Sequence, residues 1–158
     1  MARKDITMSP EEIQAFLQSG DILQVATNGP DGRPHLAPMW YVVEDGKVVF
    51  RSFTKSQKIL NLQRDPKLTV LVERGLAYTE LQGVMIRGTA ALIEDPAEVL
   101  RIYGRLAAKY AMVGDEPVDL DPEALEAAFG RFAPKNTAVV VEPVKVTSWD
   151  HTKLGGEY

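Results

Sequence analysis

The sequence predicts one domain built as an antiparallel β-barrel with helices packed outside it. The chain has 158 residues, a length that favours a single domain with its own hydrophobic core. About six short strand-like runs follow one another closely, so hairpins dominate. A parallel doubly wound sheet is disfavoured because it would need a helix after nearly every strand. No repeat, low-complexity tract or linker divides the chain, so we expect residues 1–158 to form one unit.

Capping and turn residues predict the first elements. A helix should begin at Ser9, since Pro10 suits the first helical position and Glu12 completes a capping box, and it should end at Gly20. The hairpin signal Asp45-Gly46 lies between two strand-like runs. The three expected strands, which we predict to form a meander, are residues 22–27, 34–43 and 48–53.

A change of hydrophobic period marks the second half of the chain. Residues 54–62 follow a helical period, and Asp65-Pro66 should end that helix, because the residue before proline avoids helical angles. Three more strands are expected over residues 68–72, 84–93 and 137–146. Two further helices are expected over residues 97–110 and 121–130, with a loop over 113–120 and a coil tail over 149–158.

Composition excludes several classes of protein. The formal net charge is −4, whereas a dedicated nucleic-acid binder is usually basic. No cysteine and only two histidines are present, which disfavours disulfides and a structural zinc site, and we predict no metal. Met1-Ala-Arg-Lys-Asp5 leads into a polar helix, and no apolar run approaches the roughly 18 residues of a membrane span. We therefore expect a cytoplasmic protein without membrane contact.

The segment from Arg51 to Lys58 is the strongest chemical signal. It holds three cations and three hydroxyls where a strand gives way to a helix. Unpaired N–H groups and partial positive charge at a helix start favour phosphate. Arg51 can hold two phosphate oxygens, and Lys58 adds a point charge. The segment lacks the Gly-x-x-x-x-Gly-Lys pattern of a Walker loop, and a solvated basic loop is the competing interpretation.

Several motifs in order carry a family resemblance. They are Asp31-Gly32-Arg33-Pro34-His35, Met39-Trp40-Tyr41-Val42-Val43-Glu44-Asp45-Gly46, Lys58 with Asn61-Leu62-Gln63-Arg64-Asp65-Pro66, Ile86-Arg87-Gly88-Thr89-Ala90, and Trp149-Asp150. This ordered set resembles the pyridoxamine-phosphate-oxidase-like flavin-binding split barrels. The Met-Trp-Tyr strand and the Asn-Leu-x-Arg-Asp-Pro motif are most similar to the branch that uses the deazaflavin coenzyme F420.

The resemblance implies a six-stranded split barrel that forms a homodimer, with cofactor in grooves at the subunit interface. The implied cofactor is F420, with FMN as the alternative. Gln57 stands where the FMN branch often has arginine, which disfavours FMN. Ala37 stands where the classical oxidases carry an arginine that contacts cofactor, so true pyridoxamine phosphate oxidase activity is disfavoured. The residues implied to bind cofactor are Arg51, Ser52, Ser56 and Lys58 at the phosphate, Gln57 beside them, Pro38, Met39 and Trp40 along the ring system, and Trp149 as a pocket wall.

The implied activity is hydride transfer from reduced deazaflavin to an unsaturated or quinone-like small molecule. No catalytic residue is assigned, and the proton comes from solvent or a nearby tyrosine. Two alternatives stay open: an FMN-dependent oxidoreductase of the same fold, and a module that binds cofactor, haem or fatty acid without turnover. Haem would use His35 or His151 as axial ligand. Neither histidine has Ser and Asp partners at a spacing that suggests a hydrolase triad.

Overall fold

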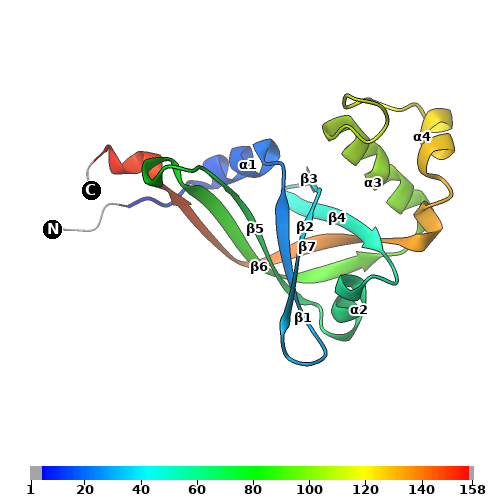
Figure 1. The fold of residues 1–158 in the computed structure, drawn as a ribbon, viewed down its shortest axis with the longest axis horizontal. Coiled ribbons are helices and arrows are strands. Elements are labelled where there is room, and N and C mark those ends of the chain that lie inside the picture. The colour runs from blue at the N-terminus through cyan, green and yellow to red at the C-terminus, as the bar shows by residue number, and fades with distance from the viewer. Residues whose placement is uncertain (1–4, 157–158) are drawn as a thin grey trace.

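A single curled antiparallel sheet forms the body of the protein (Figure 1). The computed structural model describes residues 5–156, so Met1–Lys4 and the end of the expected coil tail at Glu157–Tyr158 lie outside the described residues. Within the described residues the strand order is β2-β1-β5-β6-β7-β4-β3. The strands are β1 (Leu23–Asn28), β2 (Pro34–Met39), β3 (Val42–Glu44), β4 (Lys47–Phe53), β5 (Lys67–Arg74), β6 (Gln82–Ile93) and β7 (Asn136–Asp150).

The described residues contain seven strands where we expected six, because the predicted strand 34–43 divides into β2 and β3. The division falls at Trp40-Tyr41, where the backbone N–H of Tyr41 donates to the Tyr110 hydroxyl at 3.2 Å instead of to a neighbouring strand. β2 pairs with β1 at one edge of the sheet, and β3 pairs with β4 at the other. Both hairpins of the expected meander are present, but they lie at opposite edges of the sheet, because the chain crosses between the two edges at this point.

Helices and turns largely follow their predicted signals. The helices are α1 (Pro10–Ser19), α2 (Gln57–Arg64), α3 (Pro96–Lys109) and α4 (Pro122–Phe129), with short 3₁₀ helices η1 (Tyr78–Glu80), η2 (Ala133–Lys135) and η3 (His151–Leu154). The capping box of Ser9 and Glu12 is confirmed. Asp45 and Gly46 have φ of 50° and 76°, the positive values that a tight β-hairpin turn requires. The expected coil tail is wrong over 149–154, where β7 continues and η3 follows.

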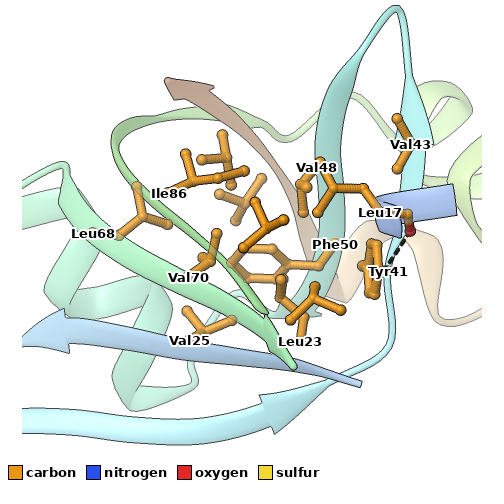
Figure 2. Packing of buried hydrophobic residues seen from close by; sticks show 14 of the residues in the cluster. Leu17, Leu23, Val25, Tyr41, Val43, Val48, Phe50, Leu68, Val70 and Ile86 are labelled. Atoms are coloured by element: carbon orange, nitrogen blue, oxygen red, sulfur yellow. Dashed lines mark hydrogen bonds between the residues drawn. The ribbon is translucent and has the colours of Figure 1, made fainter. Parts of the chain in front are cut away.

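The hydrophobic core has two parts, one on each side of β4. Phe50 is fully buried inside the curled sheet among Leu23, Val25 and Val70 (Figure 2). Val49 points the other way, into a second cluster with α3 and α4. Successive side chains of a strand alternate between its two faces. Ser52 therefore lies on the same face of β4 as Phe50, and Arg51 lies on the same face as Val49. Within residues 5–156, no helix is long and apolar enough to cross a membrane.

Candidate cofactor site

Three of the expected phosphate ligands meet where β4 runs into α2. The hydroxyl oxygens of Ser52 and Ser56 lie 3.0 Å apart, and Lys58 Nζ donates to Ser52 Oγ at 3.3 Å. Ser52 ends the buried face of β4, and Lys58 stands on the first turn of α2, so the strand-to-helix turn brings them together. We call Ser52, Ser56 and Lys58 the hydroxyl–lysine cluster.

The electrostatics of the hydroxyl–lysine cluster suit an anion. Ser56 is the N-cap of α2, yet its side chain makes no capping hydrogen bond. The first turn of α2 holds no acidic residue, so the partial positive charge of the helix start is not offset there. Burial lowers the pKa of Lys58. A dianion here would favour the charged form of the lysine and accept from the two hydroxyls.

Arg51 lies on the opposite face of β4 from the cluster. Its guanidinium stacks over the Tyr103 ring at 4.2 Å from the centroid, and Nη1 donates to Asn136 Oδ1 at 3.1 Å. Burial lowers the pKa of Arg51, although a guanidinium keeps its charge in proteins. Its Nε is buried and has no hydrogen-bond partner among the described residues. The segment from Arg51 to Lys58, which the sequence suggests is one set of phosphate ligands, is thus divided between the two faces of β4, because successive side chains of a strand point to opposite faces.

A cavity of about 360 Å³ brings Arg51 together with the residues expected along the ring system. The ring of Trp40 stacks on that of Tyr110, with centroids 4.7 Å apart, and so forms a flat aromatic wall. The cavity combines apolar walls with one cation, an arrangement that suits a flat molecule with polar acceptors at its rim. Its lining residues are Ile22, Pro38, Met39, Trp40, Arg51 and Leu106.

Gln57 is turned along its own helix. Its Nε2 donates to Asn61 Oδ1 at 2.7 Å, and Asn61 Nδ2 in turn donates to Thr27 Oγ1 at 3.0 Å. Asn61 is fully buried, so this chain of bonds ties α2 to β1. Sequence reasoning placed Asn61 in a motif without assigning it this role. Sequence reasoning assigned no role at the site to Tyr103, Tyr110 and Asn136, which reach it from distant parts of the chain.

Trp149 does not meet the other expected cofactor ligands within one chain. It lies opposite Gly83 near the end of β7, whereas Arg51 lies opposite Ala138 near the beginning of that strand (Figure 1). The indole covers the backbone of Gly83 so closely that a Cβ there would lie 2.2 Å from the Trp149 ring. Within a single chain, Trp149 packs on β6 rather than on the cavity.

Comparison with known proteins decides the family. A sequence model described as pyridoxamine 5'-phosphate oxidase matches residues 9–150. The chain belongs to the pyridoxamine 5'-phosphate oxidase family. The curled antiparallel sheet is the fold of this family, which confirms the resemblance described above. No curated protein matches the chain.

Solved structures agree with this family. A conserved hypothetical protein, Rv2991 from Mycobacterium tuberculosis, is 35% identical, with TM-score 0.87 over 100% of this chain and 94% of that chain. A protein described as an F420 reductase is 22% identical, with TM-score 0.64 over 84% of this chain and 94% of that chain. An FAD-binding protein from Mycobacterium smegmatis is 19% identical, with TM-score 0.59 over 89% of this chain and 95% of that chain. The last two identities show the common fold alone.

In this family member, an ion-pair network holds α3 against the β3–β4 hairpin and so keeps the cavity wall in place. Arg101 Nη1 donates to Glu44 Oε2 at 2.6 Å, and Arg105 Nη1 donates to the same oxygen at 2.9 Å. The Glu44 side chain is only 17% exposed. Hydrogen bonding to Arg101 lowers the pKa of the Glu44 carboxyl, with the positive charges of Arg101 and Arg105 acting in the same direction.

We expect the stabilising effect of Glu44 to be lost in acid. A carboxyl whose pKa is lower in the folded state than in the unfolded state stabilises the folded protein at pH values above the unfolded pKa. That contribution disappears as the pH falls through the pKa of the folded state. The free energy of unfolding should thus fall more steeply below about pH 5 for the wild type than for Glu44→Gln. Urea denaturation from pH 7 to pH 3 measures this, with the exposed Glu73→Gln as control. Parallel curves for wild type and Glu44→Gln would contradict the prediction.

Proposed function

We propose that this family member is an F420-dependent oxidoreductase that transfers a hydride from reduced deazaflavin to an unsaturated or quinone-like small molecule. The observation that carries the proposal is the hydroxyl–lysine cluster at the start of α2, where Lys58 reaches Ser52 and Ser56 is left without a capping bond. Such a site suits the phosphate of a flavin-type cofactor. The fold is shared with a protein described as an F420 reductase and with an FAD-binding protein, which supports a flavin-type cofactor in general.

The described residues fit such a cofactor at two places. Ser52, Ser56 and Lys58 would hold the phosphate, and the walls of the 360 Å³ cavity would hold the ring system. The buried Nε of Arg51, which has no partner among the described residues, would donate to the polar rim of the ring. A buried donor without a partner costs free energy, and an acceptor on a bound ring would remove that cost.

Gln57 favours F420 over FMN. It stands in place of the arginine that the FMN branch often has, so it adds no positive charge at the phosphate. Its amide is bonded to Asn61, which holds it along α2. The phosphate would then depend on Lys58 as the charged ligand of the cluster.

When bound in its reduced form, the deazaflavin supplies the hydride. The residues of the chain bind it, orient it and exclude water. Trp40, Met39 and Leu106 provide apolar walls. Burial raises the pKa of Tyr110, and its hydroxyl already lies 2.8 Å from the backbone oxygen of Asp21. Since this hydroxyl is committed to backbone groups, we propose that solvent supplies the proton.

A homodimer is part of the proposal. Trp149 lies near the far end of β7 from the Arg51 side of the site. It could wall the cofactor only if a second copy supplied it, as the family resemblance implies for a site at the subunit interface. Sedimentation measurements on the purified protein should therefore give the mass of a dimer, and a monomeric mass would remove Trp149 from the site.

Cofactor choice is tested by titrating the purified protein with F420 and, separately, with FMN while following tryptophan fluorescence. Trp40 lines the cavity and is 41% exposed, so a ring that docks there should quench it. In Trp149→Phe the remaining Trp40 should still be quenched. In Trp40→Phe only Trp149 still emits, so any quenching that remains must come from Trp149. Consumption of reduced F420 with a quinone then tests turnover. Tighter binding of FMN, or binding of neither cofactor, would contradict the proposal.

A further inference from the structure

The aromatic wall of the 360 Å³ cavity is supported from behind by the residue that ends α3. Tyr110 is the C-cap of this helix and is buried. Its ring lies almost parallel to the indole of Trp40, with the centroids 4.7 Å apart and the planes 9° apart. Trp40 lines the cavity and is 41% exposed. The stack therefore covers one side of the indole and leaves the rest open to a ligand.

The backbone beside Trp40 is held by side chains rather than by the sheet. Trp40 and Tyr41 belong to no strand, because the chain passes here from β2 to β3. The Tyr41 N–H donates to the Tyr110 hydroxyl at 3.2 Å, and the Tyr41 carbonyl oxygen accepts from Lys109 Nζ at 3.2 Å. Tyr41 is fully buried, and buried backbone groups need partners. The end of α3 thus supplies the partners that a neighbouring strand supplies elsewhere.

The same hydroxyl also holds a second part of the cavity wall. The hydroxyl hydrogen of Tyr110 is shared between the carbonyl oxygens of Asp21, at 2.8 Å, and Tyr41, at 3.1 Å. Asp21 directly precedes Ile22, which lines the cavity. The backbone N–H of Tyr110 donates to the carbonyl oxygen of Leu106, another lining residue, at 2.8 Å. One tyrosine therefore joins three parts of the wall that are distant in the sequence.

From this geometry we infer that Tyr110 is a positioning residue, whose hydroxyl fixes Trp40 relative to Ile22 and so sets the width of the cavity that a flat ring enters. Among the described residues that line the cavity, Tyr110 is absent, so it acts through Trp40 and not by touching the ligand. The inference rests on the proposed function for the identity of that ring, the deazaflavin.

The variant Tyr110→Phe tests the inference because it keeps the stacked ring and removes only the hydroxyl. It is made in Trp149→Phe, where Trp40 is the sole tryptophan. Without cofactor, the Trp40 emission should shift to the red and its anisotropy should fall, since Tyr41 and Asp21 have lost a shared partner. F420 should bind about three- to tenfold more weakly, the loss expected for one neutral hydrogen bond.

Tyr41→Phe in the same background is the matched control. It also removes a buried tyrosine hydroxyl, one residue from Trp40, but that hydroxyl donates to the carbonyl oxygen of Leu17 on α1 at 2.5 Å. The Trp40 emission and the affinity for F420 should stay unchanged. Lys58→Ala should weaken F420 binding and leave the emission of the cofactor-free protein unchanged, because it acts at the phosphate end of the site.

The emission of the cofactor-free proteins decides the inference. An unchanged Trp40 emission in Tyr110→Phe, or an equal change in Tyr41→Phe, would overturn it. A parent protein that binds no F420 would contradict the proposed function instead, and the emission comparison would still stand.

Circular dichroism shows whether each variant keeps the fold. If Tyr110→Phe does not fold, Lys109→Met removes the other side-chain bond to the Tyr41 carbonyl oxygen. It should give the same red shift of the Trp40 emission, and an unchanged emission would overturn the inference.

Discussion

Replacing Lys58 with alanine is expected to weaken F420 binding by roughly ten- to a hundredfold. The ammonium group lies in a partly buried position, 3.3 Å from Ser52 Oγ and beside the start of α2. A hydrogen bond to a charged group contributes about 1.5–3 kcal/mol, which corresponds to this range of affinity. Because Gln57 adds no charge, no other cation of the cluster replaces Lys58. Fluorescence titration of the variant with F420 measures the change.

Lys55→Ala is the matched control for Lys58→Ala. Lys55 is exposed and lies three residues earlier in the same segment. It carries the same charge, so its removal lowers the general attraction for an anion equally without touching the cluster. We expect little loss of affinity for Lys55→Ala. Equal losses for the two variants would mean that F420 is held by diffuse charge, and the hydroxyl–lysine cluster would then not be its phosphate site.

Replacing Phe50 with alanine is expected to destabilise the protein by about 3–5 kcal/mol, the usual cost of removing a buried aromatic side chain. Phe50 is 0% exposed, and its ring fills the centre of the curled sheet near Leu23 and Val70 (Figure 2). Its removal leaves a cavity that the surrounding strands cannot close, because each is held by hydrogen bonds to its neighbours. Urea denaturation at neutral pH, with the free energy extrapolated to zero denaturant, measures the loss.

Phe53→Ala tests whether the loss comes from burial. Phe53 stands on the same strand, three residues later, and is 54% exposed. Its replacement removes the same atoms and should change the free energy of unfolding by only about 0.5 kcal/mol, as surface substitutions usually do. A loss for Phe53→Ala as large as that for Phe50→Ala would contradict the assignment of the core to the inside of the curled sheet.

Part of the candidate site could be predicted from neighbouring residues in the sequence. Ser52, Ser56 and Lys58 lie at a strand-to-helix junction that local patterns indicate, and the structure brings them into contact. Arg51 belongs to the same segment, yet it faces Tyr103 and Asn136, which lie more than fifty positions away in the chain. Adjacent strand residues point to opposite faces, but the sequence does not reveal which residues each face contacts. For Arg51 this is decided by the packing of α3 and β7 against β4.

Local chemistry in the sequence determined the starts of α1, α3 and α4, the Asp45-Gly46 hairpin and the end of α2 at Asp65-Pro66, because caps, turns and prolines act on the residues beside them. The start of α2, expected at residue 54, lies at Gln57, where no side chain caps the helix. Only the tertiary structure decided the division of residues 34–43 at Trp40-Tyr41, where the Tyr110 hydroxyl from α3's end bonds the backbone. It alone also separated Trp149 from the Arg51 side of the site and set Arg87 opposite Lys145. These features depend on strand register and on contacts between distant segments, which the packing of the whole chain establishes.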